Sequence, residues 1–195
     1  MDPYCQALGC CYSPGDPWEG LELPYSTIVA DPPWPLRKRP NESIYGSKKY
    51  STMSLEDITA MPVADLAAKD AHLWLWVTNT YLPDAGPIVR AWGFEVTTIV
   101  TWCKPGPGVG SYVRNNTEHL IFATRGKAMT PEDKPLSSWY QWPRGRHSVK
   151  PAAALDLIEQ VSPGPYVELF ARAPRLGWDS WGMGYETGEV NGRVG

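Results

Sequence analysis

Short apolar stretches of strand length alternate along this chain with stretches of helical pattern, and this alternation is what most limits the folds open to it. The pattern predicts strands at 25–31, 72–78, 94–102, 118–124 and 166–172, and helices at 54–61, 82–92 and 151–161. The strand candidates are β-branched or aromatic runs between turn residues, whereas capping and stop signals bound the helices. Strands that alternate with helices favour an α/β protein with a mainly parallel sheet.

With 195 residues, the chain fits one domain with a full hydrophobic core. We expect an irregular N-terminal arm over 1–24, a main domain over 25–186 and a tail over 187–195. No apolar stretch reaches membrane-spanning length and the N-terminus lacks a signal pattern, so no membrane contact is expected. The four cysteines, at positions 5, 10, 11 and 103, show no CxxC spacing. This predicts reduced thiols in a cytoplasmic protein and no metal site.

The net charge of −3 does not indicate a strongly basic nucleic-acid binder. Basic residues are nevertheless concentrated in two loops, one at 35–49 with Arg37, Lys38 and Arg39, and one at 137–149 with Arg144 and Arg146. Each cluster taken alone is most simply solvated loop charge. Several of the ten tryptophans also fall in loop-like stretches, where they offer flat surfaces for stacking: Trp34, Trp139, Trp142, Trp178 and Trp181.

The first predicted strand ends in Ala30–Trp34, with the sequence "ADPPW". One interpretation is structural: Asp31 ends the strand, the two prolines force an extended loop and Trp34 folds back as a plug. The other is catalytic. An exocyclic amine of a nucleobase is a poor nucleophile, because its lone pair is delocalised into the ring. Two acceptors aimed at its N–H bonds, a carboxylate and a rigidly held proline carbonyl, would favour the pyramidal amine that attacks.

The position of the motif favours the catalytic interpretation. Parallel sheets bind ligands at the carboxyl ends of their strands, and Asp31 ends one predicted strand while Arg172 ends another. A tryptophan beside the acid would give an extruded base a surface on which to stack.

Several motifs in a fixed order resemble the MT-A (seventy-kilodalton subunit) family of adenine-N6 methyltransferases, including its bacterial and phage members. The resemblance covers roughly residues 25 to 186 and rests on "ADPPW", "KYSTMSLEDI", "HLWLWVTN", "RNNTEHLIFATRG", "RHSVKP", "LIEQVSPGPYVELFAR" and "GWDSWG". It implies a Rossmann-like methyltransferase fold with permuted, beta-class motif order, in which the catalytic strand precedes the cofactor strand. This order accounts for the lack of a complete GxGxxG dinucleotide-binding motif after any predicted strand.

The resemblance also implies roles for individual residues. Asp31 and the Pro32 carbonyl would accept from the target amine, Pro33 would stiffen the loop, and Trp34 would line the base pocket. S-adenosylmethionine is the implied cofactor, with Asp31, Lys150, Glu168, Phe170 and Arg172 around it. The implied substrate is an unpaired or flipped adenine in DNA or RNA, contacted by Trp34, Tyr50, Asn115, Glu118, Arg37, Lys38 and Arg39.

Three questions stay open at this stage. The amine of cytosine N4 poses the same chemical problem as adenine N6. A catalytically silent, nucleic-acid-binding subunit of a homodimer or heterodimer is the alternative outside the enzymes. Many relatives also have an asparagine near the cofactor ribose where this chain has Met183, and a methionine side chain donates no hydrogen bond. Glu186 or Asn191 would have to replace that contact.

Overall fold

The structure is a computed structural model. It describes residues 17–35, 52–106, 108, 112–127, 136–144, 150–182 and, for the backbone alone, 192–193. Among the helices of these residues, none has the length and apolar character needed to cross a membrane.

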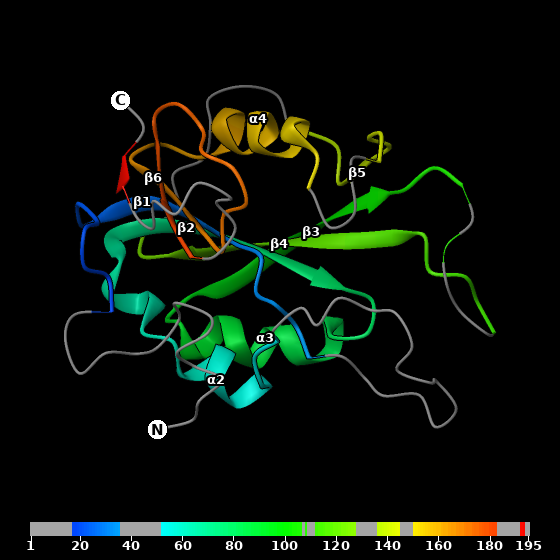
Figure 1. Cartoon of the computed structure of the whole chain (residues 1–195), viewed down its shortest axis with the longest axis horizontal. Helices are drawn as coiled ribbons and strands as arrows, with labels where there is room; N and C mark the ends of the chain where they lie inside the picture. Colours follow the sequence, from blue (N-terminus) through cyan, green and yellow to red (C-terminus); the bar gives the residue numbers. More distant parts are fainter. Residues whose placement is uncertain are drawn as a thin grey trace.

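The order of elements follows the predicted alternation (Figure 1). The strands are β1 (Tyr25–Ala30), β2 (Ala67–Thr78), β3 (Glu95–Cys103), β4 (Thr117–Arg125), β5 (Trp139–Tyr140), β6 (Tyr166–Leu169), β7 (Trp178–Trp181) and β8 (Gly192–Arg193). The helices are α2 (Leu55–Ala60), the short 3-10 helix η1 (Val63–Asp65), α3 (Leu82–Ala91) and α4 (Ala152–Val161). Ser54 caps α2 as predicted, because its side chain accepts the N–H of Asp57.

The strands form one sheet in the order β5-β3-β4-β2-β1-β6-β7-β8. Of the strands in the described residues, only β4 and β8 run antiparallel to the others, so the prediction of an α/β protein with a mainly parallel sheet is confirmed. β2 lies on one side of β1, whereas β6 lies on the other side and is followed by β7 farther out in that direction. The strand order therefore reverses between β1 and β6, and ligands of open α/β sheets bind at such a switch point.

Alternating side chains along each strand supply two cores, one on each face of the sheet. On the face covered by α2 and α3, Leu73, Leu75 and Val77 of β2 are buried. On the face covered by α4, Trp74 and Trp76 of the same strand are buried. Figure 1 shows α4 on one side of the sheet and α2 with α3 on the other. The result is a three-layer arrangement with the switch point at its centre.

Two predictions near the C-terminus were wrong. The strand predicted over 166–172 ends at Leu169, because the chain turns at Phe170, which has a positive φ of 63°. The stretch with Trp178 and Trp181 was predicted to be loop-like, yet residues 178–181 form β7 beside β6. Trp178 is 1% exposed and Trp181 packs against the core, so neither offers the stacking surface that was expected of it.

The last residues of the predicted N-terminal arm belong to the packed structure. Trp18 is buried in the core on the α2 and α3 side, and its ring meets Trp181 edge-on at 5.0 Å. The indole N–H of Trp181 donates to the carbonyl of Pro17. This short segment therefore holds β7 in place from outside the sheet.

Candidate active site

Asp31 follows β1 at the switch point, and the two prolines after it fix the loop. The Asp31 amide donates to the carbonyl of Leu169 at the end of β6. The Trp34 amide donates to the Pro32 carbonyl at 2.8 Å, which closes a tight turn around Pro33, and the Pro33 carbonyl accepts from Met53. The fixed φ of proline suits the centre of such a turn. Since a carbonyl has two lone pairs, that of Pro32 keeps one acceptor site in a fixed direction.

Trp34 turns to the α3 side of the sheet and is packed there. Its ring stacks on Tyr81 with centroids 5.4 Å apart, and its indole N–H donates to the carbonyl of Trp76 at 3.0 Å. The Tyr81 hydroxyl in turn donates to the carbonyl of Pro35. The structure therefore places Trp34 beneath the Asp31 loop, with one ring face covered. Its role in a base pocket stays a prediction.

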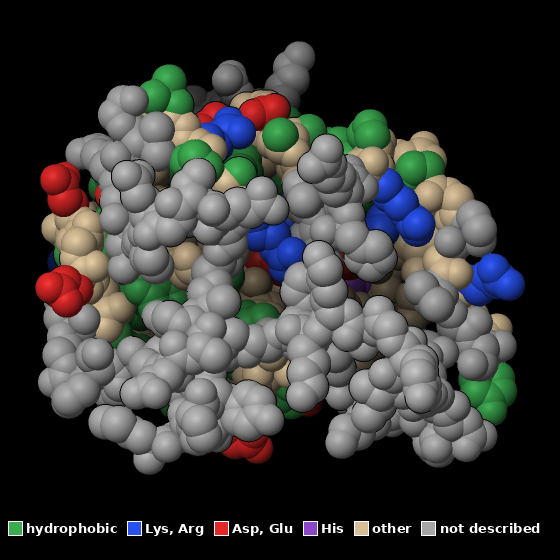
Figure 2. Space-filling model, viewed as in Figure 1, with side chains coloured by type: hydrophobic (Ala, Val, Ile, Leu, Met, Phe, Trp, Pro, Cys, Tyr) green, Lys and Arg blue, Asp and Glu red, His purple; other side chains and the backbone are tan. Residues whose placement is uncertain are grey.

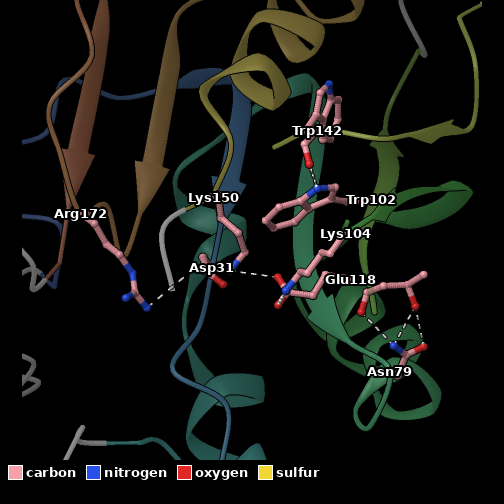
Figure 3. A network of polar contacts seen from close by, with 9 residues as sticks. Asp31, Asn79, Trp102, Lys104, Glu118, Trp142, Lys150 and Arg172 are labelled. Atoms are coloured by element: carbon pink, nitrogen blue, oxygen red, sulfur yellow. Dashed lines mark hydrogen bonds and ion pairs between the residues drawn. The ribbon is translucent and has the colours of Figure 1, made fainter. Parts of the chain in front are cut away.

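Two basic side chains approach the Asp31 carboxylate from opposite sides (Figure 3). The Lys150 ammonium lies 2.7 Å from Oδ2, and the Arg172 guanidinium lies 4.0 Å from the same oxygen. Asp31 is 8% exposed, so this ion pair is largely removed from water. The structure brings together three residues that are far apart in the sequence.

A second carboxylate, Glu118 of β4, shares one of these partners. The Lys150 ammonium lies 3.6 Å from Glu118 Oε2, and Lys104 forms an ion pair with the other oxygen of the same carboxylate. Both lysines also lie against indole rings, Lys150 over Trp76 and Lys104 over Trp102. Two lysines and two acids thus alternate along the edge of the sheet, with Lys150 between the acids.

A cavity of about 230 Å³ opens between the ends of β1 and β6 and the start of α4. Its lining includes all five residues predicted to surround the cofactor: Asp31, Lys150, Glu168, Phe170 and Arg172. Sequence reasoning did not directly identify the rest of the lining, which comes from β2, from the segment after β6 and from the start of α4: Trp76, Ala173, Pro174, Arg175, Pro151, Ala152, Ala154 and Leu155. Only the placement of Lys150 and Pro151 directly before a helix pointed toward the start of α4.

Glu168 is the cavity residue with the most unusual environment. Burial, reinforced by the charge of Asp31, raises the pKa of its carboxyl group to about 7, although Lys150, Arg175 and Arg172 act in the other direction. Its side chain makes no hydrogen bond to any residue in the described part of the chain. Such an acid lining a cavity indicates a ligand that donates hydrogen bonds or carries positive charge.

Phe170 is held in a strained conformation at the floor of the cavity. Its φ of 63° lies in the left-handed region, where bulky side chains are rare. Its amide donates to the carbonyl of Trp181, and its ring meets the Trp181 ring edge-on at 5.6 Å. A Cβ atom on Gly182 would lie 2.7 Å from the Phe170 Cα, so only glycine fits beside it. The sharp turn after β6 depends on this close approach.

The start of α4 supplies the opposite wall. Pro151 precedes the first turn, and within the described part of the chain no side chain caps the first N–H groups of the helix. Because the N-terminus of a helix attracts anions, this wall and the Lys150 ammonium favour a negatively charged group. The Asp31 and Glu168 wall favours a positively charged one. The cavity therefore suits a ligand that carries both charges a short distance apart.

The remaining predicted residues have different outcomes. Glu118 joins the site, whereas Asn115 is exposed just before β4. Tyr50, the Arg37–Arg39 cluster and Met183 lie outside the described residues, so their predicted roles stay predictions. Among the residues that are described, no group of His, Cys, Asp and Glu side chains is arranged to hold a metal ion.

A sequence model of the MT-A70 family matches residues 25–184, most of the chain. The chain belongs to the MT-A70 family. The predicted family is thereby confirmed, and with it the prediction of an adenine-N6 methyltransferase. The Rossmann-like class of the fold agrees with this membership.

Named relatives in this family include bacterial, human and fungal proteins. The type II methyltransferase M.MunI of a Mycoplasma species is 32% identical over 179 residues, covering 82% of this chain and 77% of that protein. N(6)-adenine-specific methyltransferase METTL4 of Homo sapiens is 30% identical over 81% of this chain and 37% of its own length. N6-methyladenosine RNA methyltransferase MTA1 of Pyricularia oryzae is 31% identical over 81% of this chain and 46% of its own. This chain thus spans less than half of the last two.

Proposed function

We propose that this MT-A70 protein transfers a methyl group from S-adenosylmethionine to N6 of an adenine in DNA or RNA, at the carboxyl ends of β1 and β6. The observation that carries the proposal is the position of the Asp31 carboxylate at the switch point. It forms an ion pair with Lys150 and lines a cavity that has both acidic and basic walls. S-adenosylmethionine supplies the reactive methyl group when it is bound.

The cavity favours the amino-acid end of this cofactor. Glu168 and Asp31 offer carboxylates to an α-ammonium group, while Lys150 and the N-terminus of α4 offer positive charge to an α-carboxylate. A volume of about 230 Å³ is below the range of about 300–1,000 Å³ typical of pockets that enclose a whole small molecule. We therefore assign the described cavity to this end of the cofactor, with Arg172 toward its ribose.

The residues at the end of β1 would act on the target amine. The Asp31 carboxylate and the free lone pair of the Pro32 carbonyl would accept its two N–H bonds and draw electron density toward the nitrogen. The turn around Pro33 holds the carbonyl in place, so no reorganisation is needed when the amine arrives. Lys150 and Arg172 both approach Oδ2 of Asp31, so Oδ1 can accept from the amine, while the charge of Lys150 makes the carboxylate a weaker acceptor.

Local charge supports a nucleic-acid partner although the chain is acidic overall. In Figure 2 the described Lys and Arg side chains lie at the top, centre and right of the face, whereas Asp and Glu lie at its left edge, top and bottom, so the centre and right are locally basic. Phosphate binding depends on such local charge. Trp139 is 60% exposed on β5, next to the stacked pair Tyr140 and Trp142, which fits stacking of unpaired bases. For Arg37, Lys38 and Arg39, which lie outside the described residues, we propose the role of phosphate contacts.

Two alternatives predict different results. A cytosine-N4 enzyme would give N4-methylcytosine, and a silent subunit would give no product in the absence of an active partner. The intact Asp31 loop and its ion pair with Lys150 favour an active enzyme.

The test is methyl transfer from labelled S-adenosylmethionine to matched single-stranded and duplex pools of DNA and RNA, followed by nucleoside analysis. We expect N6-methylated adenine. Single-stranded or mismatched pools should be preferred, because extruding the target base from a perfect duplex costs roughly a few kcal/mol. Cofactor binding without product from any pool would favour the silent subunit. The same assay at several salt concentrations tests the role of Arg37, Lys38 and Arg39. Replacing all three with Ala should make substrate binding less dependent on salt than in the wild-type protein.

A further inference from the structure

Asn79 lies directly after β2, and its side-chain amide binds both residues that flank Glu118. Its nitrogen donates to the carbonyl oxygen and to the hydroxyl of Thr117, each at 2.9 Å. Its oxygen lies 3.0 Å from Nε2 of His119. A single side chain therefore holds the residue before Glu118 and the residue after it.

The hydrogen-bond directions in this network are fixed by its members. A backbone carbonyl only accepts, so the amide nitrogen of Asn79 must face Thr117 and its oxygen must face His119. Nε2 of His119 therefore donates, and Nδ1 accepts from the Thr101 hydroxyl at 3.1 Å. Burial lowers the pKa of His119, against the opposing charge of Glu118, which agrees with a neutral ring. The network joins the ends of β2 and β3 to the start of β4.

Glu118 points to the other face of the sheet. Leu120, two residues along β4, packs with Trp76 and Trp102 in the core beneath α4, and side chains two apart on a strand share a face. On that face the Glu118 carboxylate meets Lys104 and Lys150 (Figure 3). Asn79 thus fixes, from behind the strand, an acid that contacts the principal partner of Asp31.

We propose that Asn79 is a positioning residue for methyl transfer, which sets the Glu118 carboxylate where it competes with Asp31 for the Lys150 ammonium. The inference rests on the proposed function, in which Asp31 accepts from the target amine. Lys150 lies 2.7 Å from Asp31 and 3.6 Å from Glu118, so a small movement transfers it from one acid to the other. When Glu118 takes Lys150, the ion pair at Oδ2 of Asp31 is broken and the carboxylate becomes a stronger acceptor for the amine.

The test is a double-mutant cycle on the maximal rate of methyl transfer, with Asn79→Ala, Glu118→Gln and the combined variant. We expect each single change to lower the rate by about tenfold to 100-fold, the loss that misplacement of a reacting group by about 1 Å produces. Because Asn79 acts through Glu118, the combined variant should be no slower than Glu118→Gln alone. The affinity for cofactor should stay unchanged in Asn79→Ala.

Two further variants separate positioning from folding. Thr97→Ala removes the hydroxyl contact with Thr124 between β3 and β4, at the end of β4 far from the site, and should leave the rate unchanged. Thr117→Val removes only the hydroxyl partner of Asn79, and should give a smaller loss that also disappears in a Glu118→Gln background. It replaces Asn79→Ala in the cycle if that variant does not fold.

Multiplied losses in the combined variant would overturn the inference, as would a normal rate in Asn79→Ala. Neither result would touch the proposed function as long as the wild-type chain methylates adenine. Absence of methyl transfer by the wild-type chain would instead contradict the proposed function itself.

Discussion

The ends of β1 and β6 lie side by side, and each places an acid at the cavity, yet the two acids have different surroundings. Asp31 forms an ion pair with Lys150 at 2.7 Å, with Arg172 close by. Glu168 makes no hydrogen bond to any described residue, and its pKa is raised to about 7. Neighbouring acids in different environments can take different tasks at one pH. We infer that the Asp31 carboxylate is kept ionised by Lys150, which can move away. Glu168, in contrast, gains its hydrogen-bond partner only when the ligand binds.

The most direct test of the different roles of Asp31 and Glu168 is to neutralise each acid in turn. Asp31→Asn keeps the shape and one acceptor oxygen but removes the charge. We expect methyl transfer to fall by about 100- to 1,000-fold, the loss seen when one preorganised transition-state partner is removed. Single-turnover transfer to an adenine-containing oligonucleotide at saturating cofactor measures it.

The matched control is Glu168→Gln. It should leave the rate at saturating cofactor within a few-fold of wild type, because we assign Glu168 to binding and not to the amine. Equal loss of rate in both variants would contradict the division of tasks between the two strand ends.

The next largest effect concerns the partner of Asp31. Lys150→Ala should weaken cofactor binding at least tenfold, because a charge-assisted hydrogen bond contributes about 1.5–3 kcal/mol and about 1.4 kcal/mol is tenfold. Calorimetry measures the affinity. Lys104→Ala is the matched lysine, since it pairs with Glu118 and does not line the cavity. If both variants bind cofactor as tightly as wild type, Lys150 acts on the carboxylates of Asp31 and Glu118 and not on the cofactor.

The sequence predicted the site better at β1 than at β6. The segment that ends in Asp31 has a continuous apolar run followed by two prolines. Because proline does not continue a central strand, the sequence itself shows where this strand ends. The apolar run at β6 continues through Phe170 and Ala171, and nothing local shows that the strand stops at Leu169. The turn there depends on Gly182 packing against Phe170, a contact between strands that no periodicity reveals.

The same limit applies to β7 and to Asn79. Asp179 and Ser180 make β7 look like a loop, but both are buried between β6 and β8, where tertiary contacts override composition. Asn79 stood inside a motif without a stated role, because its partners Thr117 and His119 lie about forty residues away. Strand direction was equally hidden: the sequence predicted β4 but not that it runs antiparallel to β2.

A change of pH tests the β6 acid without mutation. Folding raises the pKa of Glu168 from its usual 4.5 to about 7, so between these values the folded chain holds a proton that the unfolded chain has lost. The stabilisation from this proton is complete below pH 4.5 and is lost as the pH rises through about 7. The unliganded protein should therefore lose stability over this range, measured by thermal unfolding, and Glu168→Gln should lose less.

Cofactor affinity should change in the opposite sense, because an α-ammonium group favours the ionised form of Glu168. We expect the affinity to rise by up to about tenfold per pH unit below pH 7 and then to level off, as linkage to a single proton requires. Glu168→Gln should flatten the dependence. An affinity that is flat with pH in the wild-type protein would assign the ammonium group to Asp31 alone.

The smallest effect tests how the end of β6 is held. Gly182 and Gly177 both have positive φ values, 115° and 78°, so an alanine at either position strains the backbone by roughly 1 kcal/mol. They differ in their surroundings: a Cβ atom on Gly182 would lie 2.7 Å from the Phe170 Cα, whereas one on Gly177 would have no atom of the described residues within 4 Å. Gly182→Ala must therefore displace Phe170 and with it the floor of the cavity. We expect it to weaken cofactor binding by about threefold to tenfold, or about 0.7–1.4 kcal/mol. Gly177→Ala should lower the melting temperature alone, and equal affinities in the two variants would show that the cavity tolerates movement at the end of β6.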